Sequence, residues 1–505
     1  MSSLNTSLYD LSTVASPSED DITHIVQENF QRDGVYLKIG AHVLISLNPC
    51  KELSIHTNAE LEEYSKDLRN IRPTYGDRLP PHIFQTINHA YLSMRRTGYN
   101  QSIVFSGETG SGKSTSKNLA LLALASIRES SKRETHAMKL VTNASKVMEA
   151  FGNAKTAKNP NASRFGSYME IQFNERGRIL GAKFLEYLLE KSRVTATPHG
   201  ERNFHILHYL HNGASADEKS HLHFHETSNF TYLAQTSHEE MDEDIMRFEQ
   251  IREYMKSLGL NKKYQGQIFR LLAGILHLGN IVFVDAHNKN TEASSVKNIE
   301  TLNIVAEFFG VEVDALENIL TYKSQMIKKE VCTVFLDAKQ AEVQRDDLAK
   351  ALYSLLFSWI VEFINTKLCH EEQMNFIGFV DMMGFQTPSL DSFTQFCTNF
   401  ANERLHSFFN HQIFELNNTE YHEQGILVPD TAYFDNSSCI DLFMKPKSGL
   451  IPLMDKLVNK SKADNSDQDL LEVFDHAQAN HDNYTSPPLG ESHTGFTIRH
   501  YAGKT

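Results

Sequence analysis

Gly107-Glu108-Thr109-Gly110-Ser111-Gly112-Lys113-Ser114 has the form of a phosphate-binding loop, and it stands in the setting that such a loop requires. A short apolar run that is typical of a strand, residues 101–106, precedes it, and a strong helix-forming run, residues 119–125, follows it. Glycines let backbone N–H groups converge on phosphate oxygens, and the start of the helix adds partial positive charge. The sequence therefore predicts a site for a nucleoside triphosphate.

Individual positions of this loop have separate expected roles. Lys113 is expected to reach the β- and γ-phosphates, and the hydroxyl group of Ser114 is expected to ligate Mg²⁺. The alternative is a glycine-rich turn that binds nothing. The match at every position of the loop, with a strand before it and a helix after it, favours the phosphate-binding interpretation.

The composition fits a large protein of the cell interior. The chain has 505 residues, of which 40% are hydrophobic and 22% charged, which is enough for more than one subdomain. Its 5 cysteines are scattered, so neither a disulfide framework nor a zinc-binding spacing is present. We see no signal peptide and no apolar run of membrane-spanning length, and we expect a cytoplasmic protein. A net charge of −14 argues against general binding of nucleic acids.

Apolar patterns divide the chain into regions. Residues 1–21 are polar and are expected to form a flexible N-terminal arm. Short apolar runs alternate with helical patterns over residues 22–210, which indicates an α/β domain, and residues 239–320 are mostly helical in pattern. Apolar residues at helical spacing over residues 348–363 predict one long helix. The predicted fold is an α/β P-loop NTPase core with a central, mostly parallel, twisted sheet flanked by helices, plus a largely helical second subdomain.

Two further segments have the residues needed to sense a γ-phosphate. Asn159-Pro160-Asn161-Ala162-Ser163-Arg164-Phe165-Gly166 combines small polar side chains with an arginine, which can hold Mg²⁺ and phosphate oxygens and release them after hydrolysis. Asp381-Met382-Met383-Gly384-Phe385-Gln386 follows a predicted buried strand, residues 376–380, where an aspartate suits a metal and a glycine N–H suits the γ-phosphate. Each segment alone also fits an ordinary polar loop, but coincidence does not readily explain three motifs in this order.

This combination of motifs resembles the myosin motor head. Ser163-Arg164-Phe165-Gly166 resembles myosin switch I, Asp381 to Gln386 resembles switch II, and the helix predicted from Asp391 resembles the relay helix. Asn48-Pro49-Cys50-Lys51 is similar to the segment that lies over adenine. The resemblance runs from about Ile22 to Thr505. It includes further head signatures at residues 189–194, 201–205, 275–280 and 500–503.

A narrower resemblance points to one branch of this family. Residues 159–163, 80–84, 94–96 and 345–350 resemble the myosin motor-like domain at the N-terminus of fungal chitin synthases, the class XVII myosins. In those proteins a membrane-embedded glycosyltransferase follows the head. The resemblance implies actin filaments as a partner and a chitin synthase domain covalently linked in a longer chain. It also implies a place on the actin cytoskeleton and, through the linked domain, on a vesicle or plasma membrane surface.

The domain expected from the resemblance covers residues 22–505 and is a truncated motor-like domain. The SH3-like barrel that many myosins carry at the N-terminus is not recognisable, because the first strand-like segment already lies near the adenine segment. The converter and the lever, which the family places after the His-Tyr-Ala-Gly signature, are not recognisable either. We therefore expect a head without a lever, either as a fragment or as a truncated gene product.

The resemblance also implies ATP and Mg²⁺ as cofactors and assigns roles to particular residues. The residues expected to bind the nucleotide are Asn48, Pro49, Lys51, Gly107, Glu108, Thr109, Gly110, Ser111, Gly112, Lys113, Ser114, Thr115 and Asn159. Those expected to ligate the metal are Ser114, Ser163 and Asp381. Those expected to act in hydrolysis are Asn161, Ser163, Arg164, Gly384 and Gln386.

Two residues depart from the family at positions that handle hydrolysis. Most myosins carry a glutamate at the last position of switch II, where it pairs with the switch I arginine, whereas this chain places Gln386 opposite Arg164. Removing one partner of a desolvated ion pair typically costs about 3–5 kcal/mol. Ala162 stands where myosins usually carry a serine close to the attacking water, and losing one such hydrogen-bonding group costs on the order of 10²–10³ in rate. We therefore expect an ATPase with intact nucleotide binding and impaired hydrolysis.

Three functions compete for this sequence. The first is an ATP-driven, actin-binding motor head, and the second is an ATP-binding module that tethers a chitin synthase to actin without movement. The third is a kinesin-like or other P-loop NTPase, which Phe165-Gly166 and the closing His500-Tyr501-Ala502-Gly503 disfavour. Actin-activated phosphate release distinguishes the first from the second, because a tether binds actin without activation.

Overall fold

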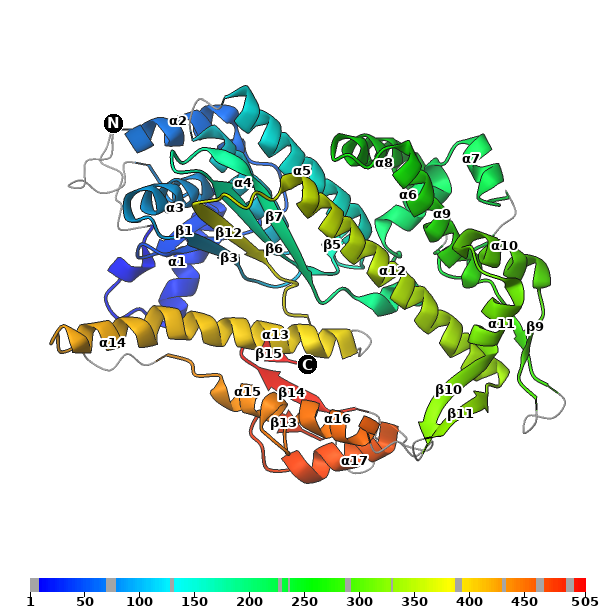
Figure 1. Ribbon diagram of the computed structural model, residues 1–505. Coiled ribbons are helices and arrows are strands. Elements are labelled where there is room, and N and C mark those ends of the chain that lie inside the picture. Colours follow the sequence, from blue (N-terminus) through cyan, green and yellow to red (C-terminus); the bar gives the residue numbers. More distant parts are fainter. Residues whose placement is uncertain are drawn as a thin grey trace. The chain divides into compact units, whose positions relative to one another are not determined.

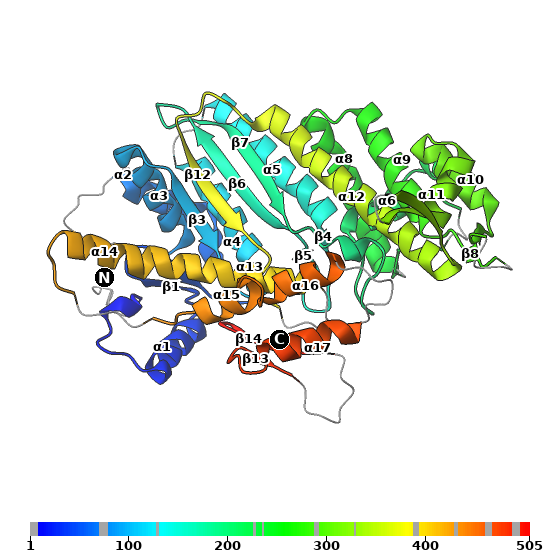
Figure 2. The same ribbon diagram turned by 60° about the horizontal axis from the view of Figure 1, so that its bottom comes forward.

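The computed structural model describes most of the chain (Figures 1 and 2). The described residues are 9–69, 79–127, 131–225, 229–234, 237–286, 292–327, 330–386, 393–428, 433–459, 467–486 and 495–505. Contacts divide the chain into two compact units. The first unit comprises Met1–Ser106 and Gly110–Met382, and the second comprises Gly107–Thr109 and Met383–Thr505.

A four-stranded sheet organises the first unit. Its strands, in order, are β3 Gln101–Phe105, β12 Asn375–Asp381, β6 Gly166–Phe173 and β7 Ile179–Tyr187. β3 and β12 are parallel, whereas β12 with β6 and β6 with β7 are antiparallel. The prediction of a mostly parallel sheet is therefore wrong for the described residues, and the sheet is mixed. The physical reason is that β6 and β7 form a hairpin, and a short turn can join only antiparallel neighbours; the Asn174 side chain accepts two backbone N–H groups in that turn.

Four helices pack against this sheet. Their bounds are α3 Ile83–Thr97, α4 Lys113–Ser126, α5 Lys132–Gly152 and α12 Ala338–Leu368. α3 and α4 contact β3 and β12, whereas α5 and α12 contact β7. The Asn365 side chain on α12 pairs with both backbone groups of Phe184 on β7, at 2.7 and 2.8 Å. Apolar strand residues such as Ile377 and Phe379 are fully buried, so the sheet and these helices share one core.

The long helix predicted over residues 348–363 is confirmed, and α12 extends it to 31 residues. Its core-facing side differs from the predicted apolar stripe, because Leu355 is 68% and Trp359 38% exposed, whereas Tyr353 is fully buried. The Tyr353 hydroxyl donates to the carbonyl oxygen of Phe151 at 2.6 Å. The helix has two neighbouring apolar faces, and the face with this buried hydrogen bond is the one that packs inward.

The other elements of the first unit are shorter than α12 or α5. Those between residues 239 and 320 are mostly helices, as predicted. The helices are α1 Glu19–Gln31, α2 Asn58–Arg69, α6 His205–Gly213, α7 Ala216–His221, α8 His238–Ser257, α9 Lys262–Leu278, α10 Ile299–Phe309 and α11 Val313–Thr321, with 3₁₀ turns η2 Leu11–Thr13, η3 Ser54–His56 and η4 Lys191–Val194. Antiparallel pairs are formed by β1 Tyr36–Ile39 with β2 Val43–Ser46, β4 Asn153–Ala154 with β5 Ala162–Ser163, β8 Phe283–Val284 with β9 Ser295–Val296, and β10 Tyr322–Ile327 with β11 Glu330–Phe335.

Part of the stretch expected as a flexible arm carries defined structure. Asp10 forms a bridge with Lys38 on β1, and its side chain caps η2. Ser18 and Asp21 form a capping box at the start of α1, each side chain pairing with the other's backbone N–H. Residues 1–8 of the expected arm lie outside the described residues.

A long helix, shorter helices and a small sheet form the second unit. Their bounds are α13 Phe393–Asn410, a π-helical turn His411–Glu415, α14 Leu416–Glu423, α15 Ser437–Met444, α16 Leu450–Asn459, α17 Asp467–Gln478, β13 Tyr484–Thr485, β14 Thr497–His500 and β15 Gly503–Lys504. α13 is the helix predicted from Asp391, and residues 387–392 lie outside the described part. Phe443 is fully buried and stacks on Phe400 of α13 with ring centroids 4.8 Å apart. It lies in a separate core that also contains Leu450 and Ile498.

Two glycines give opposite predictions for an added methyl group. A Cβ at Gly181 on β7 would lie 2.0 Å from the carbonyl oxygen of Leu368, so Gly181→Ala should destabilise the first unit by about 1–3 kcal/mol. Gly266 lies inside α9 with nothing within 4 Å of an added Cβ, so Gly266→Ala should stabilise it by about 0.5–1 kcal/mol. Urea unfolding followed by circular dichroism measures both changes. A Gly181→Ala chain as stable as the original would contradict the packing of α12 against β7.

Candidate functional site

The loop that joins β3 to α4 has a backbone shape that requires its glycines. Gly107, Gly110 and Gly112 have φ angles of +147°, +84° and +96°, in the left-handed region that other residues rarely adopt. Gly112 is also the N-cap of α4 and makes no side-chain cap. The first backbone N–H groups of a helix have no partner inside the helix and point out of its start. This is the arrangement of an anion-binding helix start.

Three side chains meet where α4 begins and β12 ends. The Ser114 hydroxyl donates to Asp381 Oδ2 at 3.4 Å, and Lys117 Nζ lies 2.7 Å from the same oxygen. The Asp381 and Lys117 side chains are 4% and 11% exposed. The structure thus brings together Ser114 and Asp381, which the sequence predicts as metal ligands. The sequence reasoning missed Lys117, although its position three residues after Ser114 places both on one face of a helix.

Hydrogen bonds hold the segment that resembles switch I. Its strand β5 pairs with β4. Asn161 Oδ1 accepts from Asn153 Nδ2 at 3.0 Å, and His205 Nε2 lies 3.1 Å from the same oxygen. Asn159 Oδ1 accepts from the backbone N–H of Asn161 at 2.9 Å. These contacts give the segment a fixed place in the first unit, which an ordinary polar loop does not need.

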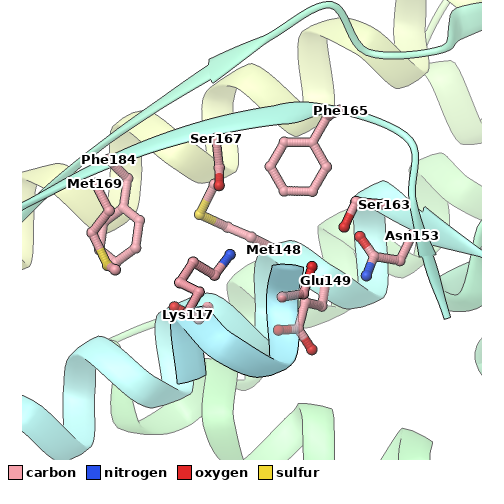
Figure 3. A pocket seen from close by; sticks show the side chains of 11 residues that line it. Lys117, Met148, Glu149, Asn153, Ser163, Phe165, Ser167, Met169 and Phe184 are labelled. Carbon is pink, nitrogen blue, oxygen red and sulfur yellow. The ribbon is translucent and has the colours of Figure 1, made fainter. Parts of the chain in front are cut away.

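A cavity in the first unit lies between this segment and α4 (Figure 3). It has about 410 Å³ of empty space, open solvent included. Ser114 and Lys117 from α4 line it together with Ser163 from β5 and Asn153 from β4. The Lys117 side chain extends from its helix into this space. The cavity therefore connects the predicted metal ligands Ser114 and Ser163.

Arg164 lies in a buried chain of alternating charges. Its guanidinium is 3.6 Å from Glu190 Oε2, and Arg193 Nε lies 2.7 Å from the same oxygen. Arg193 in turn pairs with Glu201 at 2.9 Å. Burial lowers the pKa of Arg164, and the charge of Glu190 acts in the opposite direction. Arg164 Nε also donates to the carbonyl oxygen of Ser163 at 3.0 Å, so the network fixes the arginine beside the predicted metal ligand.

The segment predicted to lie over adenine is attached to the phosphate-binding loop. Asn48 Nδ2 donates to the carbonyl oxygen of Gly110 at 2.8 Å. Asn48 Oδ1 accepts from the backbone N–H of Cys50 at 2.9 Å, which bends the chain around Pro49. Lys51 forms an exposed ion pair with Asp33 at 2.6 Å. Asn48 is therefore the predicted residue of this segment that contacts the loop directly.

In the second unit, α13 holds residues 383–386, the later part of the segment that resembles switch II, by hydrogen bonds. The backbone N–H of Gln386 donates to Asn399 Oδ1 at 3.1 Å, and Asn399 Nδ2 donates to the carbonyl oxygen of Gln386 at 2.9 Å. Asn402, one turn further along, donates to the carbonyl oxygen of Met383 at 2.9 Å. The side chain of Gln386 donates through Nε2 to Thr109 Oγ1. Both asparagines were missed by the sequence reasoning; their signal is two buried amides on an aromatic-rich helix.

Glu403 follows Asn402 on α13 and holds the segment His500-Tyr501-Ala502-Gly503 in place. Glu403 is fully buried, and its Oε1 accepts from His500 Nδ1 and from the backbone N–H of Tyr501, both at 2.9 Å. Burial raises the pKa of Glu403, but the hydrogen bonds from His500, Asn436 and Tyr501 outweigh this effect and hold the pKa below its usual range. Cys439 lies close to Glu403 and His500, and the three side chains are of types that can ligate a metal. Because protein donors already occupy the carboxylate, we interpret the group as a hydrogen-bonded clamp.

The remaining predicted residues differ in how far they are exposed to solvent. Glu108 and Thr115 are exposed, Ser111 and Lys113 are half-buried, and Gly384 is buried. The residues that the sequence reasoning missed are Lys117, Glu190, Arg193, Asn399, Asn402 and Glu403. They share one property, a buried polar side chain that pairs with another polar group of the fold.

The fold and this site correspond to a known class of protein. The chain matches the family model of the myosin head (motor domain) over residues 8–505, and it therefore belongs to this family.

Among curated proteins, the chain is 40% identical to chitin synthase 8 of Mycosarcoma maydis, over 97% of this chain and 25% of that protein. It is 40% identical to chitin synthase 5 of Cryptococcus neoformans var. grubii, over 98% of this chain and 26% of that protein. It is 36% identical to the myosin-I heavy chain of Dictyostelium discoideum, over 98% of this chain and 20% of that protein. The resemblance to myosin heads and to the fungal chitin synthases is confirmed, and the chain spans about a quarter of those synthases. None of the helices in the described ranges has the length and apolar character that a bilayer span requires.

The buried charges around Arg164 predict a large effect of a small change. Glu190→Gln removes the carboxylate that Arg164 and Arg193 share, and we expect it to destabilise the first unit by about 3–5 kcal/mol. The matched control is Glu243→Gln, which removes an ion pair with Arg247 whose side chains are 60% and 47% exposed, and we expect a change below about 1 kcal/mol. Urea unfolding of both variants is the measurement. Equal, small effects would contradict the charge network.

Proposed function

We propose that this chain is an ATP-binding myosin motor head with a P-loop NTPase core. The observation that carries the proposal is the meeting of the Ser114 hydroxyl with the Asp381 carboxylate, directly after a glycine loop that begins a helix. A hydroxyl and a carboxylate are oxygen ligands of the kind that Mg²⁺ prefers. The helix start and Lys113 suit the phosphates. The donors present therefore fit ATP together with Mg²⁺.

Each part of the ligand has an assigned set of residues in this proposal. The triphosphate is held by Gly107, Glu108, Thr109, Gly110, Ser111, Gly112, Lys113, Ser114 and Thr115. The base and its surroundings are held by Asn48, Pro49, Lys51 and Asn159. Ser114, Ser163 and Asp381 hold Mg²⁺, directly or through water. The metal, when bound, supplies positive charge that offsets the charge of the phosphates.

Hydrolysis is assigned to Asn161, Ser163, Arg164, Gly384 and Gln386, and we propose that it is impaired. The resemblance gives position 386 a carboxylate that pairs with the switch I arginine, whereas Gln386 carries no charge. Its side chain donates to Thr109 in this structure, and Arg164 pairs with Glu190. Ala162 lacks the hydroxyl that the family usually places beside the attacking water. Nucleotide binding depends on neither residue, so binding is retained while turnover is slowed.

The family supports a partner and a location for this activity. Myosin heads act on actin filaments, and we propose actin as the partner and the actin cytoskeleton as the location. The similarity to two chitin synthases supports a linked chitin synthase domain in a longer chain, which would bring the head to a vesicle or plasma membrane surface. We further propose that the motor-like domain covers residues 22–505.

A second candidate function follows from the residues at positions 162 and 386. A head that binds ATP and actin but hydrolyses slowly would serve as a non-motile tether. Phosphate release measured with and without actin filaments separates the two functions. A motor is activated by actin, whereas a tether cosediments with filaments and shows no activation.

Lys113→Ala tests whether the loop binds ATP. We expect ATP affinity to fall by roughly 100-fold, because each hydrogen bond to a charged group contributes about 1.5–3 kcal/mol. Calorimetric titration with ATP and Mg²⁺ is the measurement, and circular dichroism checks that the variant is folded. Lys139→Ala, at an exposed position on α5, is the control with the same charge change. Equal affinity in the Lys113 variant and the original chain would refute the assignment.

Gln386→Glu tests whether the missing charge slows hydrolysis. A carboxylate can keep the contact with Thr109, because a hydroxyl can donate as well as accept. It also supplies the charge that the family uses at this position, and we expect single-turnover hydrolysis to rise by about tenfold or more, with ATP affinity unchanged. Chemical-quench assays with the protein in excess over ATP measure the rate, with Gln424→Glu at an exposed position as the control. A fast original chain, or an unchanged rate in the variant, would mean that hydrolysis is not impaired by Gln386.

A further inference from the structure

A lysine forms an ion pair with Asp381, the carboxylate that the proposed function assigns to the metal. Lys117 Nζ lies 2.7 Å from Asp381 Oδ2, and both side chains are almost completely buried. The same oxygen accepts from the Ser114 hydroxyl at 3.4 Å. One atom of Asp381 therefore contacts both a proposed metal ligand and a protein cation.

The helix places this cation by simple geometry. Lys117 follows Ser114 by three residues on α4, so the two side chains share one face. Long side chains on a helix lean toward its N-terminus, which directs Lys117 toward the loop. Figure 3 shows the side chain extending into the cavity that Ser114 and Ser163 also line.

The other charged groups at this cavity do not cancel the charge of Lys117. Glu149 lines the cavity, but its carboxylate already pairs with Lys146 on the same helix at 2.7 Å. Asp381 is the acidic group that faces Lys117 directly. The lysine and the aspartate thus form a nearly neutral pair at the point where the proposed function needs an acid for Mg²⁺.

We infer that Lys117 is a tethered cation that makes nucleotide binding by this chain less dependent on Mg²⁺. The inference rests on the proposed nucleotide site. Without Mg²⁺, the ammonium group cancels the negative charge of Asp381, which would otherwise repel the phosphates. With Mg²⁺, the same ammonium group repels the metal and occupies Asp381, which reduces what the metal adds. Both effects bring the affinities with and without Mg²⁺ closer together.

Removing the charge of Lys117 tests the inference. A fluorescent ATP analogue is titrated into the full chain in magnesium chloride and, separately, in EDTA, and the ratio of the two dissociation constants is compared. Lys117→Gln keeps a hydrogen-bond donor for Asp381 but carries no charge. We expect the EDTA-to-magnesium ratio to rise by about tenfold or more in this variant. Lys155→Met is the matched control, because it removes an ion pair of the same 2.7 Å length, with Glu240, and does not line the cavity.

The outcomes separate this inference from the proposed function. Binding by the original chain in magnesium chloride, with a raised ratio only in Lys117→Gln, supports the inference. An unchanged ratio in that variant overturns it and leaves the nucleotide site standing. The absence of binding by the original chain in both solutions overturns the proposed function itself.

A second measurement applies if Lys117→Gln does not fold, as judged by circular dichroism. The ratio is then read from the original chain alone. A loss of affinity in EDTA below about 100-fold supports the tethered cation, and a larger loss overturns it.

Discussion

The parallel pairing of β3 with β12 is the constraint on which the candidate site depends. It sets Phe105 opposite Asp381, so the chain leaves β3 at the edge where β12 ends. The Ser114 hydroxyl can then reach Asp381 although 267 residues separate them in the sequence. A slip of one residue in this register would turn Asp381 to the other face of the sheet and take it away from both Ser114 and Lys117.

The antiparallel strands bring a second segment of the chain to the same edge of the sheet. β12 runs antiparallel to β6, with Asp381 opposite Ser167, so the end of β12 lies beside the start of β6. The residues that come directly before β6 are those that resemble switch I, and they are thereby brought to Asp381. A parallel β6 would have placed its last residues, instead of its first, beside Asp381. The mixed sheet is thus the arrangement that brings two segments to one carboxylate.

Local patterns were sufficient to predict the glycine loop, the helix that follows it and the long helix α12, because each depends on neighbouring residues. Pairings between distant residues were not predictable in the same way. The direction of β6 depends on its hairpin with β7, and the inward face of α12 depends on a hydrogen bond from Tyr353 to Phe151. Lys117 could be placed near Ser114 from helix spacing alone, but its ion pair with Asp381 required the sheet register.

The two residues that depart from the family differ in how the structure surrounds them. Gln386 is half-buried, and its side chain contacts a hydroxyl group that can adapt to a carboxylate. Ala162 is buried in β5, where a serine hydroxyl would have to find a hydrogen-bond partner or pay the cost of desolvation. Restoring charge at position 386 is therefore compatible with the present fold, whereas restoring a hydroxyl at position 162 requires an acceptor in the cavity or in a bound ligand. Slow hydrolysis would then follow from the fold around β5 as well as from one missing charge.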